Sequence, residues 1–170
     1  GLAMLRADEA DFAIGSFVTV PDDIVYESIW SYDPTLITPL DHPQTKINSP
    51  TIEQISEYGL ILPPKHLATW RVIEAEFEKH GAKLNVALEA GGWEVIKRYV
   101  ELGMGISIVT DVCLTDHDKV AKTPLLEYFP KRTYGIVVRR GKFLSPQSKQ
   151  FINNIDAGFF ERHAGSLASN

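Results

Sequence analysis

The stretch GWEVIKRYVELGMGISIV, residues 92–109, passes from a helical to an extended pattern. Its first half places apolar side chains on one helical stripe, at Val95, Ile96, Tyr99, Val100 and Leu102. The glycines of Gly103-Met104-Gly105 then end the helix, and the apolar run 106–109 is typical of a buried strand. A helix followed directly by a buried strand indicates an α/β chain.

The same alternation continues on both sides of this stretch. Short apolar or proline-bracketed runs predict strands at residues 11–15, 24–30, 35–40, 59–62, 84–88 and 134–138. Helical spacing predicts a helix at 67–80. It also predicts a final helix that begins with Ser145 as its N-cap and includes Phe159. Thr51 and Gln54 form a capping box that begins a short helix through Glu57.

Composition narrows the class of protein. The 170 residues are 44% apolar, 23% charged and 10% aromatic, which excludes a disordered or low-complexity chain. Seventeen basic and 22 acidic side chains give a net charge of −5, unfavourable for binding DNA directly. No apolar run reaches membrane-spanning length, and the start does not resemble a signal peptide. The single cysteine, Cys113, excludes an internal disulfide and favours a reducing compartment.

Signatures of catalysis are weak. A phosphate loop runs from strand to helix, whereas Gly103-Met104-Gly105 lies between a helix and a strand. Asp41-His42-Pro43 and Asp116-His117-Asp118 lack a second histidine at ligand spacing, so both are interpreted as surface turns. Cys113 has no local sequence typical of an activated thiol. We therefore predict no catalytic residues, no metal site and no cofactor.

Three loops suit a small ligand better. In doubly wound sheets ligands bind beyond the carboxyl ends of strands, against helix N-termini. Ser16 and Phe17 follow the first predicted strand, residues 63–69 follow another, and residues 90–93 follow a third. Their hydroxyls and backbone amides fit an anionic or zwitterionic molecule. A plainer interpretation stays open: Thr69 as a helix-terminal hydroxyl and Trp93 as a packing residue.

The order of motifs resembles the effector-binding domain of LysR-type transcriptional regulators over about residues 2–160. The segments that carry the resemblance are ADFAIG (10–15), TLITPLDHP (35–43), TIEQI (51–55), YGLI (58–61), GWEVIKRYVELGMGI (92–106) and VVRRG (137–141). The VIKRYV run at 95–100 is most similar to the cysteine-regulon activator (CysB-like) branch, which suggests a role in cysteine biosynthesis.

This resemblance implies a two-lobed α/β fold of the type 2 periplasmic-binding-protein kind, truncated at the N-terminus of lobe I. Lobe I would comprise residues 1–39 and 112–165, lobe II residues 40–111, and residues 166–170 a tail. The family places a winged helix-turn-helix, a linker helix and the first strand and helix of lobe I before such a segment. The chain is therefore expected to be a fragment that does not bind DNA by itself.

The resemblance also implies a site between the lobes, held by hydroxyls and backbone amides. Ser16 stands where the branch usually has threonine, and Thr69 with Arg71 matches a second hydroxyl position apart from one residue of spacing. The expected effector-binding residues are Ser16, Phe17, Pro64, Lys65, Thr69, Gly91, Gly92 and Trp93. The branch commonly has threonine and aspartate near Trp93, so a bulky Trp93 departs from its pattern.

The implied protein is a cytoplasmic bacterial regulator, a homo-dimer or tetramer at full length, away from membranes. It would bind an anion such as sulfate or an acetylserine and contact promoter DNA only through its N-terminal domain. A periplasmic solute-binding protein with the same fold is the first alternative. An enzyme on this scaffold, such as a hydroxymethylbilane synthase or a dehydratase, is a weaker one, because the reactive cysteine loop or acid/base cluster is missing.

Overall fold

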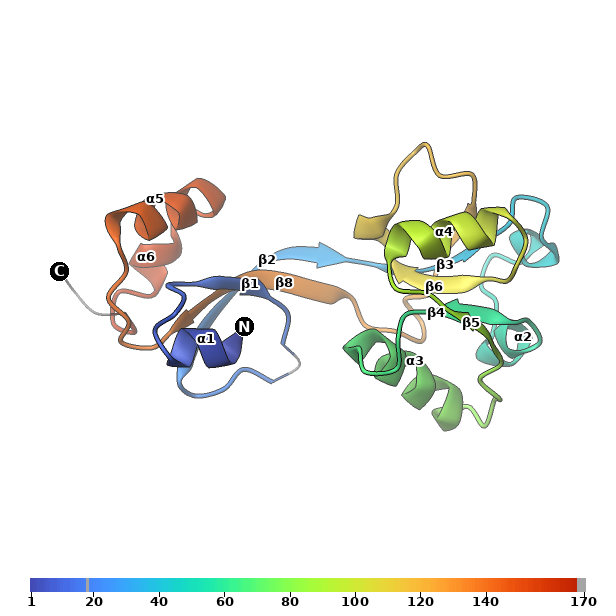
Figure 1. Cartoon of the computed structure of the whole chain (residues 1–170), viewed down its shortest axis with the longest axis horizontal. Coiled ribbons are helices and arrows are strands. Elements are labelled where there is room, and N and C mark those ends of the chain that lie inside the picture. Colours follow the sequence, from blue (N-terminus) through green and yellow to red (C-terminus); the bar gives the residue numbers. More distant parts are fainter. Residues whose placement is uncertain (18, 168–170) are drawn as a thin grey trace. The chain divides into compact units, whose positions relative to one another are not determined.

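The computed structural model describes residues 1–17 and 19–167, which form two compact units. The first unit combines Gly1–Ser31 with the described residues from Thr133 onward, and the second unit is the uninterrupted stretch Tyr32–Arg132. In the part of the chain that is described, no helix is long and apolar enough to cross a membrane. Both units contain α-helices and β-strands (Figure 1), as the alternating sequence patterns predict.

The first unit is a three-stranded sheet with helices on both faces. Its strand order is β1-β8-β2, with β1 at Ala13–Gly15, β8 at Arg132–Arg139 and β2 at Ile24–Tyr32. Neighbouring residues of a strand point to opposite faces of the sheet. On one face, Val137 packs with Leu5 of α1 (Leu2–Arg6). On the other face, Ile136 and Val138 pack under α5 (Pro146–Ile155) and α6 (Phe159–Arg162). The sequence predicts one continuous final helix, but the structure has two helices there, α5 and α6, separated by a turn.

The second unit is built on two groups of strands joined by one bridge. β3 (Pro34–Thr38) lies between β6 (Ser107–Thr110) and β7 (Ala121–Pro124) and is antiparallel to both. β4 (Leu60–Leu62) is parallel to β5 (Val86–Glu89). A parallel bridge between Leu60 and Ile106 connects β4 to the segment that leads into β6. All five residues of β3 are buried, which agrees with its proline-bracketed apolar sequence.

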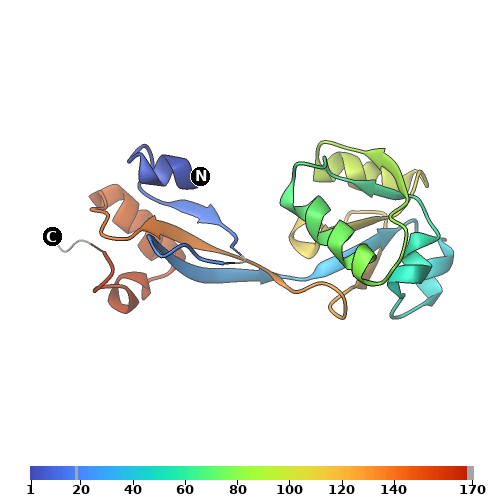
Figure 2. The same ribbon diagram turned by 90° about the horizontal axis from the view of Figure 1, so that it is seen from below.

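Helices cover both faces of these strands. α2 (Ile52–Ser56) and α3 (Ala68–Lys79) pack on one face, around Leu36, Ile73 and Phe77. α4 (Trp93–Glu101) packs on the other, around Ile37, Ile96 and Val100. Figure 1 and Figure 2 show α3 and α4 on opposite sides of the strands. The short helices η1 (Pro43–Lys46) and η2 (Asp111–Cys113) lie in connecting loops.

Several local predictions are confirmed and others are corrected. Thr51 and Gln54 form both hydrogen bonds of the capping box, and Gly81 and Gly103 adopt positive φ angles directly after helices. The apolar stripe of α4 is narrower than expected, because Val95 and Leu102 are exposed while Lys97 is buried.

The unit boundaries differ from the expected lobe boundaries. The chain divides at Ser31/Tyr32 and Arg132/Thr133, whereas 39/40 and 111/112 were expected. The physical reason is strand pairing: β7 hydrogen-bonds to β3, so residues 112–132 pack with the second unit.

The first two residues of the expected tail, residues 166–170, contact the first unit. The carbonyl of Ser166 accepts a hydrogen bond from the amide of Gly141, and Leu167 packs against the core beneath α5 and α6. Residues 168–170 lie outside the described residues.

Candidate effector-binding site

The second unit has one edge at which several loops leave neighbouring strands. The amide of Ala90 donates to the carbonyl of Leu62 (2.9 Å), so β4 and β5 end side by side. β6 is joined to β4 by the parallel bridge and ends on the same side, at Thr110. We call this side the carboxyl edge, defined by Leu62, Glu89 and Thr110 and the loops that follow them. This is where a ligand is expected in an α/β sheet.

The loop after β4 leads into α3. Pro63 and Pro64 end the strand, and Leu67 is the N-cap of α3 without a side-chain capping bond. The first-turn amides of α3 therefore have no side-chain acceptor from the N-cap, and they favour an anion nearby. Lys65 is exposed, and its ammonium lies 5.2 Å from the centroid of the Trp70 ring.

The loop after β5 leads into α4 in the same way. Gly92 is the N-cap of α4, again without a side-chain capping bond. A Cβ atom placed on Gly91 or Gly92 would meet nothing within 4 Å, so the backbone here is open. Trp93 is half-buried and packs against the core around Ile96, which supports the packing interpretation for part of its ring.

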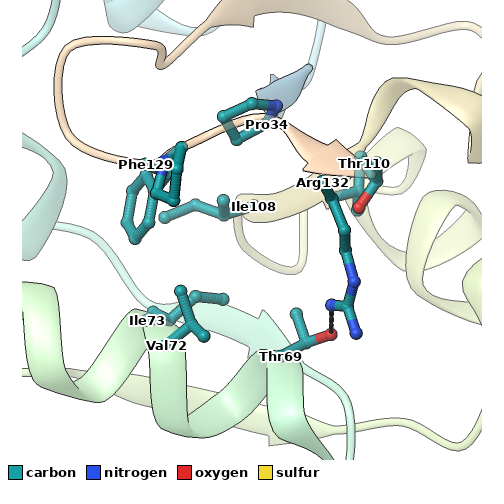
Figure 3. A pocket seen from close by; sticks show the side chains of 10 residues that line it. Pro34, Thr69, Val72, Ile73, Ile108, Thr110, Phe129 and Arg132 are labelled. Atoms are coloured by element: carbon teal, nitrogen blue, oxygen red, sulfur yellow. Dashed lines mark hydrogen bonds between the residues drawn. The ribbon is translucent and has the colours of Figure 1, made fainter. Parts of the chain in front are cut away.

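Thr69 pairs with an arginine that the sequence did not indicate. Arg132 Nη1 donates a hydrogen bond to Thr69 Oγ1 (2.9 Å), as the dashed line in Figure 3 marks. The resemblance implied Arg71 as the neighbouring cation, but the guanidinium that reaches this hydroxyl is that of Arg132. The two residues are 63 positions apart, and no local motif surrounds Arg132, so only the folded chain identifies the pair.

A buried ion pair supports α4 behind its N-terminus. Lys97 Nζ lies 2.8 Å from Glu94 Oε1 and 3.0 Å from Asp118 Oδ1. Burial lowers the pKa of Lys97, but the hydrogen bonds to Glu94 and Asp118 outweigh it, and the pKa is raised above the ordinary value. Asp118 is thus a half-buried partner of Lys97, whereas Asp116 and His117 form the exposed turn that the sequence predicts.

Ser16 and Phe17 belong to the first unit. Ser16 is exposed directly after β1, and the ring of Phe17 packs edge-on against Tyr26 with centroids 5.4 Å apart. The other six expected residues, Pro64, Lys65, Thr69, Gly91, Gly92 and Trp93, all follow strands at the carboxyl edge of the second unit. That Ser16 and Phe17 contact the same ligand stays a prediction.

The groups weighed for catalysis have ordinary structural surroundings. Burial raises the pKa of the Cys113 thiol, which disfavours the reactive thiolate. His42 Nδ1 accepts a hydrogen bond from the amide of Gln44 (3.2 Å) and caps η1. Among the residues described, no group of three or more His, Cys, Asp or Glu side chains is placed to hold a metal ion.

These features define an α/β domain with a candidate ligand site at strand and helix ends, and the comparisons with known proteins identify its family. The LysR substrate binding domain matches residues 2–159. The chain belongs to this family, and it is an effector-binding domain of the LysR type. The resemblance inferred from the motifs is confirmed.

Two relatives from Burkholderia cenocepacia agree with this assignment. The chain is 31% identical to the HTH-type transcriptional regulator SsuR over 88% of its own length and 49% of the relative's. It is 26% identical to the regulator CysB over 83% of its own length and 46% of the relative's. The chain thus spans about half the length of the curated relatives it matches.

Solved structures confirm the two-lobed, periplasmic-binding-protein-like fold. The cofactor-binding domain of the Cbl transcriptional regulator matches with a TM-score of 0.82 at 24% identity, covering 99% of this chain and 76% of that one. The regulatory domain of CcmR from Synechocystis, solved with 2-PG, matches with a TM-score of 0.79 at 24% identity, covering 92% and 76%. At this identity the likeness shows the fold.

Proposed function

We propose that this domain senses a small anionic or zwitterionic metabolite at the carboxyl edge of its second unit. The observation that carries the proposal is the Thr69–Arg132 pair (2.9 Å), which places a hydroxyl and a guanidinium at one point of that edge. The N-termini of α3 and α4 add backbone amides whose N-caps supply no side-chain acceptor. Similarity to CysB and Cbl supports sulfate or an acetylserine as the first candidates.

The proposed mechanism is binding linkage. The effector favours one conformation of the regulator, and it shifts the equilibrium only by its difference in affinity for the two states. In this proposal the domain carries out no chemistry, acts in the cytoplasm, and belongs to a dimeric or tetrameric protein whose separate N-terminal domain binds promoter DNA. The relatives named as HTH-type transcriptional regulators support this assignment.

The direct test is calorimetric titration of the 170-residue chain with sulfate, O-acetylserine and N-acetylserine. For the tightest of these ligands, Thr69→Val is expected to weaken binding by roughly tenfold or more, because one charge-assisted hydrogen-bonding point is lost. Thr69→Ser retains the hydroxyl and serves as the matched control, with affinity within about threefold of the original. If Thr69→Val binds the ligand as tightly as the original chain does, Thr69 does not contact the effector and the central part of the proposal is wrong.

A second measurement tests the link to DNA. In the intact regulator, the same ligand must change the affinity for operator DNA at constant salt concentration. Binding of the ligand without any change in DNA affinity, at every operator tested, would leave the site standing and contradict the regulatory mechanism.

A further inference from the structure

A pocket opens beside Thr69, between α3 and the strands of the second unit. It has a volume of about 60 Å³ and an open mouth, so it has room only for a short ligand of a few heavy atoms. Every residue that lines it belongs to the second unit. Figure 3 shows α3 on one side, with Thr69, Val72 and Ile73, and the strand segments with Pro34 and Ile108 on the other.

The two ends of this pocket differ in chemistry. At one end Arg132, Thr69 and Thr110 bring polar groups together, and at the other end Phe129 faces Val72 (Figure 3). Arg132 is the one charged side chain among the described residues that line the pocket, and none of them carries a carboxylate. The polar end therefore attracts negative charge, while the rest of the lining is a hydrocarbon surface.

The hydrogen bond within the polar end also orients its donors. Because Thr69 Oγ1 accepts from Arg132, the hydroxyl proton of Thr69 points away from the guanidinium and is available to an incoming acceptor. The guanidinium is a cation whose planar shape matches the geometry of a carboxylate. The cation, the hydroxyl donor and the apolar wall together fit a ligand that has an anionic group at one end and a hydrocarbon group at the other.

We propose that this pocket binds a monocarboxylate carrying a short hydrocarbon arm, with the carboxylate at Arg132 and Thr69 and the arm against Val72, Ile73 and Phe129. The inference rests on the proposed function, since it names the class of ligand for the same Thr69 site. It also separates organic anions from inorganic ones. Sulfate would reach Arg132 and Thr69 but would leave the apolar wall uncovered, so the pocket discriminates against it.

The test is titration of the 170-residue chain with acetate, butyrate, butyramide and sulfate. Each fully buried methylene strengthens binding by about fourfold. Butyrate has two more methylenes than acetate, and since the pocket buries them only in part, we expect it to bind roughly tenfold more tightly. Butyramide has the same arm without the charge and is expected to bind at least about tenfold more weakly than butyrate. Arg132→Gln is expected to weaken the binding of butyrate by at least about tenfold as well. Circular dichroism checks that the variant is folded.

A matched pair of variants locates the arm. Val72 and Val95 are both helical and similarly exposed, at 45% and 44%, but only Val72 lines the pocket. Val72→Asn is expected to reduce the butyrate-to-acetate ratio below about threefold, because it places an amide in the apolar wall. Val95→Asn is expected to leave the ratio near tenfold.

The outcomes separate this inference from the proposed function. If butyrate and acetate bind equally, or sulfate binds as tightly as butyrate while still depending on Thr69, the hydrocarbon subsite is wrong and the anion sensor stands. If neither these probes nor the acetylserines bind at all, both are wrong. The butyrate-to-butyramide comparison needs no variant, so the inference is tested even if Arg132→Gln fails to fold.

Discussion

Lys97 is buried inside the second unit with its ammonium 3.0 Å from the carboxylate of Asp118, 21 residues further along the chain. The side chain of Lys97 is 3% exposed and that of Asp118 12%, whereas Glu94, the second partner of the lysine, is 86% exposed. The two ion pairs therefore have different energetics, since removing one member of a buried pair strands the other charge. Exposed pairs contribute little.

We expect Asp118→Asn to lower the free energy of unfolding by about 3 kcal/mol, near the lower limit for a broken buried pair because Glu94 remains. The matched control, Glu94→Gln, removes the exposed partner and is expected to cost less than about 1 kcal/mol. Urea unfolding followed by tryptophan fluorescence measures both, since Trp70 and Trp93 lie in the same unit as the pair. If the two variants lower the free energy of unfolding equally, the Lys97–Asp118 pair is not the dominant one.

Asp11 predicts an acid-sensitive contact in the first unit. Hydrogen bonds from Ser148 and Ser145, at the N-terminus of α5, lower the pKa of Asp11 from 3.8 to about 2. A lowered pKa in the folded state stabilises the protein above pH 3.8, and this stability is lost as the pH falls towards 2. We expect Asp11→Asn to cost about 1–2 kcal/mol at pH 6 and almost nothing near pH 2.

The measurement is the difference in unfolding free energy between the original chain and Asp11→Asn at several pH values. Asp116→Asn, in an exposed turn, is the control and is expected to show a difference within about 0.5 kcal/mol at each pH. A cost for Asp11→Asn that does not change between pH 6 and pH 2 would show that the carboxylate charge is not its source.

Gly105 is required where β4 and β6 approach each other. A Cβ atom on Gly105 would lie 2.6 Å from the carbonyl oxygen of Gly59, closer than real Cβ atoms come. Gly105→Ala is therefore expected to destabilise the fold by about 2 kcal/mol, because the two segments must move apart. Gly91→Ala is the control, since its Cβ would meet nothing within 4 Å. Thermal unfolding of the two variants checks the contrast.

Gly92→Ala separates ligand binding from stability. Its φ of −175° is extended backbone that any residue adopts, and its Cβ would meet nothing within 4 Å. The variant should keep the melting temperature of the original chain within about 2 °C. If the effector contacts the amides at the start of α4, the added methyl group occupies part of its space and weakens binding about tenfold. Unchanged affinity would place the effector away from α4.

The features that the sequence predicts well are those whose cause is local. The capping box of Thr51 and Gln54 involves residues three apart, and the buried strand β3 is bracketed by its own prolines. The loops at the carboxyl edge follow from short apolar runs that end in proline or glycine. Each of these depends on neighbouring residues alone, so no knowledge of the folded chain is needed.

The features that the sequence does not predict depend on distant partners. Sequence spacing predicts that Val95 and Leu102 are buried on α4, but Lys97 is buried and these two residues are exposed. The burial of Lys97 requires Asp118, which comes from another loop. Arg132 acquires its role only by reaching Thr69 across 63 residues. The unit boundaries shift for the same reason, since β7 pairs with β3 and not with its sequence neighbours.

The division of the chain into a continuous second unit and a split first unit has a consequence for biosynthesis. Residues 32–132 leave the ribosome as one block and can fold while the last strand and helices are still being translated. β1 has no such option, because its neighbour β8 begins at Arg132. Until that strand is synthesised, β1 lacks its partner β8, so the first unit is completed only after the whole of the second has been translated.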